Sequence, residues 1–287
     1  MKYQILMDVS GDVDAGFAKE HGIGFLPMGY TLREENRICA GMEPREILKA
    51  FYDGQREGSL TQTTQITPIQ YEELFEPYLA AGQPILYLCL SSGLSSTFES
   101  ANLAVSGLRE KYPDLPVLPV DTLAATGGMG VLAERAVRNR EREMEIRENY
   151  EDLLRAVKHI RHFFFVQDLM YLKRGGRVSS AEAVLGTALN IRPVMMIDPV
   201  GKLQVIDKKH GTKQAVRAVV QAFEKYYDPD SGDVVYITDG DSEESAEAVH
   251  QALREAFPDA VIRRIGLSPI IGAHTGPGAL TLDFIGK

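Results

Sequence analysis

Short apolar strands alternate with helical segments through the first half of the chain, and this alternation limits the possible folds more than any other feature. Strands are predicted at residues 3–8, 23–27, 85–90 and 117–120. Helical patterns are found at 13–21, at 43–52, from 67 onward, from 96 onward and at 124–138. The strand at 85–90 is a nearly continuous apolar run, as in a buried parallel strand. This order predicts an α/β domain with a parallel sheet and helices on both faces.

The second half of the chain has a different pattern, with a hairpin among its strands. Strands are expected at 163–166, 191–197, 202–206, 234–238, 260–265 and 280–285, and helices at 179–189, 213–226 and 242–257. The turn signal Asp-Pro-Val-Gly at 198–201 predicts a hairpin, and the whole pattern predicts an α+β domain with a mixed sheet. The charged stretch 138–152 predicts a solvent-facing helix near the boundary between a first domain, 1–157, and a second domain, 158–287.

The charge of the chain is acidic, with 31 Lys and Arg against 40 Asp and Glu and a formal net charge of −9 at pH 7. This balance does not favour a nucleic-acid groove or an anionic membrane surface as partner. No apolar run approaches the ~18 residues of a membrane span, and the first residues resemble a strand rather than a signal peptide. Cys39 and Cys89 lie in apolar surroundings, which is typical of buried free thiols. We expect a cytoplasmic protein without nucleic-acid binding or stable membrane insertion.

Three hydroxyl-rich loops lie between predicted strands and the helices that follow. They read TQTTQ at 61–65, SSGLS at 91–95 and DT at 121–122. Two of them lead into predicted capping boxes, Thr67 with Gln70 and Ser96 with Glu99. Ligands of parallel sheets collect beyond the carboxyl ends of strands, and helix N-termini with hydroxyls suit a carboxylate or phosphate. The loops therefore indicate an anion site, while helix capping and turn formation are the structural alternative.

Two further segments carry candidate ligand contacts. His274 lies in HTGPG at 274–278, where two glycines and a proline predict a tight loop that can approach a ligand closely. Arg177 lies in a polar turn, GGRVS at 175–179, and could contact an anion, a partner surface or solvent. The glycine-rich segment 127–130 falls inside a predicted helix and indicates close packing. Phosphate-loop, dinucleotide-binding, nucleophile-elbow and zinc-protease motifs are absent, so no cofactor or metal is expected.

The order of these blocks resembles the DegV family of bacterial fatty-acid-binding proteins, the lipid-carrying subunits of fatty acid kinase. The resemblance spans nearly the whole chain. It is carried by Asp8, TTQITP at 63–68, SSGLSST at 91–97, DT at 121–122, YLKRGGRV at 171–178, LNIRP at 189–193 and HTGPG at 274–278. The chain departs from the family pattern at Val9, Ile66, Ser96 and His210.

The resemblance implies that one long-chain fatty acid lies between the two domains. Its carboxyl group would be held at the positions that match Thr63, Ser95 and His274. Supporting contacts would come from the ligand loops at Thr64, Ser92, Gly93, Asp121, Thr275 and Gly276. The carrier itself would be non-catalytic and would present the acid to a separate ATP-dependent kinase, which makes the acyl-phosphate. Arg177 would contact that partner or the phosphate.

Two other classes of function remain as alternatives. A serine hydrolase acting on a lipid or ester would use Ser95 or Ser92 with His274 and Asp121, since catalytic triads are recognised by geometry rather than by chain order. A phosphate-metabolite binding protein would use the helix N-termini and would need a basic pocket, for which Arg177 is the obvious candidate.

Overall fold

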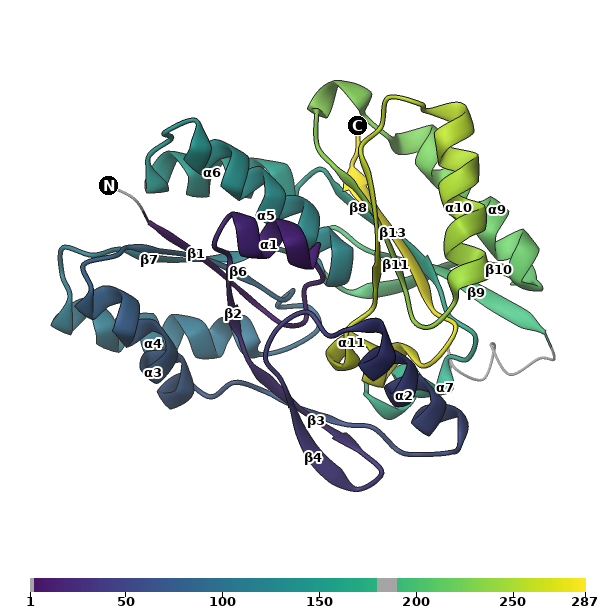
Figure 1. The fold of residues 1–287 in the computed structure, drawn as a ribbon, viewed down its shortest axis with the longest axis horizontal. Coiled ribbons are helices and arrows are strands. Elements are labelled where there is room, and N and C mark those ends of the chain that lie inside the picture. The colour runs from purple at the N-terminus through teal and green to yellow at the C-terminus, as the bar shows by residue number, and fades with distance from the viewer. Residues whose placement is uncertain (1–2, 180–189) are drawn as a thin grey trace.

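The first half of the chain forms a four-stranded parallel sheet in the order β2-β1-β6-β7 (Figure 1). The computed structural model describes residues 3–179 and 190–287, so the helix expected at 179–189 lies, from residue 180 on, outside the described residues. The strands of the sheet are β1 (Gln4–Asp8), β2 (Gly24–Leu26), β6 (Ile85–Cys89) and β7 (Val117–Asp121). Each pairing is parallel. All of β6 is buried, as its apolar run predicts.

Helices cover both faces of this sheet, which confirms the predicted α/β layering (Figure 1). One face carries α3 (Pro68–Ala80) and α4 (Thr97–Lys111), and the other carries α1 (Ala15–Glu20), α5 (Thr126–Glu141) and α6 (Ile146–Val157). Neighbouring strand residues point to opposite faces. Leu6 of β1 therefore packs into the core beneath α3 and α4, whereas Met7 packs into the core beneath α5 and α6.

Of the two predicted capping boxes, one is confirmed and one is wrong. The box at Thr67 forms, with its side chain and that of Gln70 each accepting a backbone N–H. Ser96 has φ −79° and ψ 14° and makes no cap hydrogen bond, because this backbone is closer to helical than to the extended form of a capping residue. The preceding Ser95 takes its place, and its Oγ accepts from Thr97 N at 3.3 Å.

A three-stranded antiparallel sheet, in the order β4-β3-β5, is not predicted by the sequence pattern. Its strands are β3 (Met28–Leu32), β4 (Glu35–Cys39) and β5 (Thr63–Thr64). Most of β4 is exposed, and the turn residues Arg33 and Glu34 have φ values of 52° and 64°. Such a turn usually contains Asn or Gly, so neither the strand nor the turn carries its usual signal. The following helix α2 (Arg45–Arg56) starts and ends later than the predicted 43–52.

The second half forms a six-stranded sheet in the order β10-β9-β8-β13-β11-β12. Its strands are β8 (Ile160–Phe165), β9 (Ile191–Ile197), β10 (Leu203–His210), β11 (Val235–Asp239), β12 (Ile262–Gly266) and β13 (Leu280–Ile285). The predicted hairpin forms between β9 and β10. β11 pairs in parallel with β12, whereas the other pairings are antiparallel, so the prediction of a mixed sheet is confirmed. The helices α9 (Thr212–Tyr226) and α10 (Glu243–Ala256) cover one face of this sheet. Phe223 lies in the core between these helices and the sheet.

The glycines of α5 allow this helix to pack closely, as predicted, against β11 and the loop that follows β1. A Cβ atom at Gly127 would lie 2.6 Å from Cβ of Tyr236 on β11. One at Gly130 would lie 2.3 Å from the backbone oxygen of Asp12. Real Cβ atoms do not approach so closely, so α5 can pack this tightly only with glycine at these positions.

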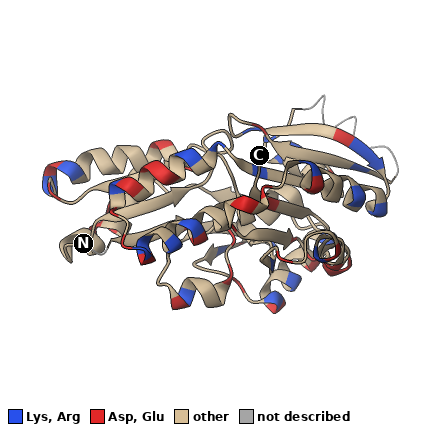
Figure 2. Cartoon of the chain, turned by 90° about the horizontal axis from the view of Figure 1, so that it is seen from above, with Lys and Arg blue, Asp and Glu red and all other residues tan. Residues whose placement is uncertain are grey.

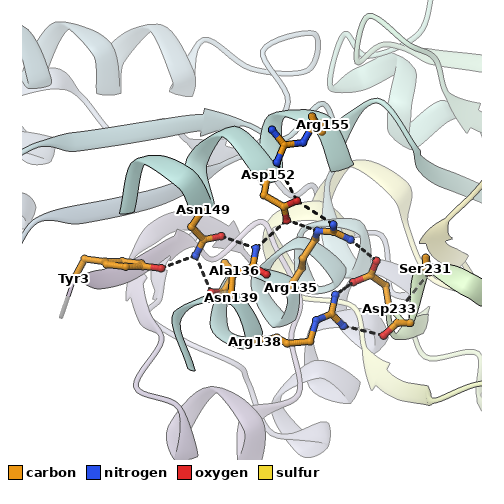
Figure 3. Close-up of polar contacts among 11 residues, drawn as sticks. Tyr3, Arg135, Ala136, Arg138, Asn139, Asn149, Asp152, Arg155, Ser231 and Asp233 are labelled. Carbon is orange, nitrogen blue, oxygen red and sulfur yellow. Dashed lines mark hydrogen bonds and ion pairs between the residues drawn. The ribbon is translucent and has the colours of Figure 1, made fainter. Parts of the chain in front are cut away.

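A buried polar network fastens α5 and α6 to the segment that precedes β11 (Figure 3). Arg135 donates to Asp152 at 2.6 Å and to Asp233 at 2.7 Å, and Arg138 pairs with Asp233. Asp152 has its pKa lowered to about 2, mainly by hydrogen bonding from Arg135. The charged stretch 138–152 is therefore not one solvent-facing helix as predicted. It contains the end of α5, a turn and the start of α6, and buried Asn149 lies within it.

Charges of both signs are interspersed along the outer helices (Figure 2). Lys49 and Asp53, for example, lie 2.7 Å apart on α2. Within the described ranges no helix combines the length and the apolar character that a membrane span requires. Cys39 and Cys89 are both buried and free, as predicted, and burial raises the pKa of the Cys39 thiol to about 12.

Candidate functional site

A cavity of about 820 Å³ lies where elements from the two halves of the chain meet. The loop after β6 contributes to its wall from the first half, and β8, β9, β10, α7 (Met170–Arg174) and α11 (Pro269–Thr275) contribute from the second. Apolar side chains of this wall include Leu90, Leu94, Phe164, Ile197, Leu203 and Ile270. Small-molecule pockets typically measure about 300–1,000 Å³. The cavity is therefore large enough to bind an apolar ligand of moderate size.

Thr63 and His274 meet in the wall of this cavity. His274 lies in the last turn of α11, so the prediction of a loop beginning at this residue is wrong. Pro269 occupies the first turn of that helix, where its missing N–H costs no hydrogen bond. Thr63 lies on β5, which pairs with Tyr30 of β3. Thr63 Oγ1 lies 3.0 Å from His274 Nε2.

The imidazole of His274 is neutral at neutral pH. Burial lowers its pKa to about 4, and the positive charge of Arg177 acts in the same direction. Its Nδ1 atom is buried and, among the described residues, has no hydrogen-bond partner. Gly175 packs against this atom, because a Cβ at residue 175 would lie 2.2 Å from Nδ1. A neutral imidazole offers one N–H donor and one acceptor. The backbone of Gly175 lies against the Nδ1 side of the ring, and Nε2 is the atom near Thr63.

Ser95 and Ser92 line the cavity from the loop between β6 and α4. Ser95 Oγ lies 2.6 Å from Thr97 Oγ1. Ser92 N donates to Asp121 Oδ1 at 3.1 Å. Because α4 begins directly after this loop, its N-terminal backbone groups and these hydroxyls together form a neutral surface that suits an anion.

The β9–β10 hairpin holds this serine loop in place. Ser91 Oγ donates to the carbonyl oxygen of Gly201 at 2.8 Å. A Cβ atom at Gly93 would lie 2.5 Å from the same oxygen. Gly93 therefore allows the loop to approach the hairpin closely rather than lining the cavity itself.

Arg177 lines the cavity and directs its hydrogen bonds to backbone carbonyls. Nε donates to Leu94 O at 3.1 Å, and Nη1 donates to Gly175 O. Burial lowers the pKa of Arg177. Among the described residues no acidic side chain forms an ion pair with this guanidinium. A half-buried cation whose hydrogen bonds to Leu94 and Gly175 go to neutral carbonyls favours an anionic ligand or partner group.

The remaining predicted contacts occupy different positions. Thr275 lines the cavity, and its Oγ1 donates to Ile271 O within α11 at 3.2 Å. Thr64 is exposed on β5. Asp121 accepts backbone N–H groups in the turn after β7, and Gly276, with φ 74°, packs against the ring of Tyr171. Thr64, Asp121 and Gly276 are therefore not among the residues that line the cavity.

Several cavity residues are not predicted by the sequence reasoning. Arg174 and Tyr171 line the wall, with the guanidinium carbon 4.5 Å from the centre of the tyrosine ring. Both belong to the YLKRGGRV block, so a close reading of that motif could have found them. Thr126, His162 and Thr281 also line the wall. None of the three belongs to a motif block of the sequence analysis, and His162 lies just before the strand predicted at 163–166.

The sequence of the chain matches a family model along nearly its full length. The model, described as an uncharacterised protein of the DegV family, matches residues 2–287. The chain belongs to the DegV family. A relative from Thermotoga maritima (strain ATCC 43589), named as a fatty acid-binding protein, is 31% identical over 287 residues, which is 98% of this chain and 96% of that protein.

Two solved structures share the DegV fold seen here. A DegV lipid binding protein from Thermotoga maritima has a TM-score of 0.85 at 26% identity, covering 100% of this chain and 99% of that one. The Streptococcus pneumoniae fatty acid kinase B3 protein, loaded with linoleic acid, has a TM-score of 0.84 at 19% identity, covering 99% of each chain. At that identity the second likeness is one of fold. Both confirm the predicted fold class.

The residues of the alternative hydrolase triad do not assemble in this DegV protein. His274 Nε2 faces Thr63, and no carboxylate among the described residues binds its Nδ1 atom. Asp121 instead accepts from the backbone of Ser92 and Leu123. A Ser-His-Asp triad uses a carboxylate to orient the histidine, and Asp121 does not take that position toward His274.

Proposed function

We propose that this DegV protein binds one long-chain fatty acid in the cavity and presents its carboxyl group to a separate ATP-dependent kinase in the cytoplasm. The observation that carries the proposal is the pair formed by Thr63 and His274, 3.0 Å apart, in the wall of a cavity lined by both apolar and polar side chains. The 31% identity to a fatty acid-binding protein supports the same ligand class. In this account residues 1–157 and 158–287 are two domains with the acid between them.

The head group would be held by neutral donors. Thr63, Ser95 and His274 supply two hydroxyls and an uncharged imidazole to the cavity. A buried carboxylate needs hydrogen bonds to offset its lost hydration, and these groups provide them without forming a tight ion pair. One carboxylate oxygen would then stay available for phosphoryl transfer. Arg177 would stabilise the developing phosphate or contact the kinase.

The tail would supply most of the affinity. Each buried methylene contributes about 0.8 kcal/mol, so a tail of roughly sixteen carbons contributes on the order of 10 kcal/mol before entropic costs. The apolar part of the wall, with Leu90, Phe164 and Ile270, fits an acyl chain better than a small phosphate metabolite. This ordering of energies favours the carrier function over the phosphate-binding alternative.

The carrier would contribute no chemistry of its own. It needs no resident cofactor in this account, because the ATP that donates the phosphoryl group belongs to the kinase. Among the described residues no group of three or more His, Cys, Asp or Glu side chains could hold a metal. The catalytic step would therefore depend on how the complex presents the carboxyl group.

Native mass spectrometry of the purified protein, followed by solvent extraction and lipid analysis, tests the carrier function. We expect one fatty acid per chain, lost on denaturation. A chain without lipid that also fails to take up added oleic or palmitic acid would contradict the proposal.

The kinase step is tested separately with Arg177→Gln. We expect the variant to keep its fatty acid and to lower acyl-phosphate formation by a DegV-dependent kinase. Lys173 lies in α7, shortly before Arg177 in the chain. Lys173→Gln is therefore the matched control and should retain full acyl-phosphate formation. Equal rates of acyl-phosphate formation for Arg177→Gln and the unchanged protein would show that Arg177 takes no part in the transfer step.

A further inference from the structure

The inner face of the six-stranded sheet carries a row of buried polar side chains. His162 of β8 pairs in register with Asp283 of β13, and Phe164 pairs with Thr281. Alternate residues of a strand point to the same face, so these four side chains share the face that meets α5. The opposite face, with Phe163 and Leu282, is apolar and packs beneath α9 and α10.

Short polar contacts connect Asp283 with its neighbours in this row. His162 Nδ1 lies 2.5 Å from Asp283 Oδ1, and Thr281 Oγ1 donates to Asp283 Oδ2 at 2.7 Å. Thr126 Oγ1, at the start of α5, lies 3.5 Å from the same carboxylate oxygen. His162 is 4% exposed and Asp283 is fully buried. The carboxylate therefore lies against Nδ1 of His162 and also accepts from the two threonines.

Part of this row opens into the cavity described above. Thr126, His162 and Thr281 all line its wall, beside the apolar Phe164 and Ile197. Because Nδ1 faces Asp283, Nε2 is the ring atom left for the cavity, and within the described chain it has no polar partner. The cavity thus has a second polar section, formed by residues different from Thr63 and His274. A purely hydrocarbon tail would cover these polar side chains without forming hydrogen bonds to them. Burying polar groups without hydrogen bonds costs free energy.

The chemistry of the second section selects the group that it would bind. Asp283 behind the wall disfavours another anion at this place. A hydroxyl both donates and accepts, so it can donate its single proton to one acceptor of this section, such as His162 Nε2, and can accept through its oxygen. A ketone only accepts, and a methylene does neither.

We propose that the cavity binds a hydroxylated long-chain fatty acid, with its carboxyl group at Thr63 and His274 and a hydroxyl along its chain at His162, Thr126 and Thr281. This inference rests on the proposed fatty acid binding and names the subclass of acid. The second polar section then acts as a specificity site, because a chain hydroxyl reaches it only when it stands at the matching distance from the carboxyl group.

Competition binding tests the inference. Delipidated protein is loaded with a fluorescent fatty acid, which is displaced by stearic acid or by hydroxystearic acids that differ in the position of the hydroxyl. We expect at least one positional isomer to bind roughly 3- to 10-fold more tightly than stearic acid, as one added hydrogen bond predicts. If stearic acid binds but no isomer is preferred, the inference is overturned while the proposed function stands. If no fatty acid binds at all, both fail.

Two variants locate the preference. Thr281→Val removes a hydroxyl from the wall, and Thr238→Val is its matched control, because Thr238 pairs in register with Thr281 on β11 but does not line the cavity. We expect the first to reduce the preference for the hydroxy acid and the second to retain it. The double variant His162→Phe, Asp283→Leu replaces both members of the buried pair by apolar groups and should reverse the preference. An unchanged preference in both the Thr281 variant and the double variant would overturn the inference.

Discussion

Thr63 Oγ1 and His274 Nε2 lie 3.0 Å apart although 211 positions separate the two residues in the chain. The first comes from a two-residue strand and the second from the last turn of a short helix. Neither element would be stable alone, and each packs against β3: β5 pairs with it, and α11 contacts it. The small β4-β3-β5 sheet, which caps one side of the cavity, is therefore what brings the two side chains together.

Replacing Thr63 with valine should weaken fatty acid binding. The substitution keeps the branched shape that suits a strand and removes one hydroxyl, at a cost of roughly 1–2 kcal/mol, or about 5- to 30-fold in Kd. Thr64→Val is the matched control, because Thr64 is exposed on the same strand. Titration of delipidated protein with oleic acid measures both. Equal losses in the two variants would mean that the strand, rather than the Thr63 hydroxyl, matters.

The stability of the protein should fall as the pH drops from about 6.5 to about 4, in part because of His274. Its folded pKa of about 4 lies below the ordinary value of 6.5, so in this window the unfolded chain binds a proton that the folded chain excludes. The free energy of unfolding therefore decreases on acidification, by about 1–3 kcal/mol for this residue. Urea unfolding of the unchanged protein and of His274→Gln at several pH values isolates the contribution. Parallel pH profiles would contradict it.

Gly175→Ala should disturb the site without disturbing the backbone. Gly175 has φ −72°, which alanine adopts freely, yet its Cβ would lie 2.2 Å from His274 Nδ1. The ring must then leave its position, and we expect a loss of roughly 2- to 10-fold in fatty acid affinity. Gly41→Ala, where the nearest atom to a Cβ is 3.8 Å away, provides the control. Unchanged affinity in Gly175→Ala would show that the ring position is not needed.

Asp233→Asn should destabilise the fold while leaving the site chemistry in place. Asp233 is 5% exposed and pairs with Arg135 at 2.7 Å and with Arg138 (Figure 3). Loss of its charge leaves Arg138 poorly compensated and Arg135 with Asp152 as its remaining carboxylate, which costs on the order of 1–3 kcal/mol. Asp53→Asn disrupts an exposed pair with Lys49 and should cause no measurable change. Chemical denaturation compares the two, and similar midpoints would argue against a stabilising network.

The larger architecture follows from the sequence because its signals are long and local. The buried run of β6 and the capping box at Thr67 each predict an element from a few neighbouring residues. The β3–β4 hairpin is not predicted, because its turn contains Arg33 and Glu34 at positions that glycine usually occupies. Helix α11 is not predicted either, because its seven residues, beginning at Pro269, are too few to show a clear helical period of apolar residues.

The candidate site is only partly visible in the sequence for the same reason. Motif blocks point to Thr63, Ser95, Arg177 and His274, all of which line the cavity. No local pattern shows that His274 would face Thr63, or that His162 and Asp283 would pair across two strands. Such contacts depend on register and on packing between distant segments, which a single sequence does not encode in neighbouring residues.

The most direct test of the central claim follows the carboxyl group itself. Palmitic acid labelled with carbon-13 at the carboxyl carbon is bound to the delipidated protein, and the carboxyl resonance is recorded by NMR. The account predicts one resonance displaced from that of the free acid, which moves in Thr63→Val and His274→Gln and keeps its position in Thr64→Val. A bound resonance that is identical in all four proteins would place the carboxyl group elsewhere and contradict the account.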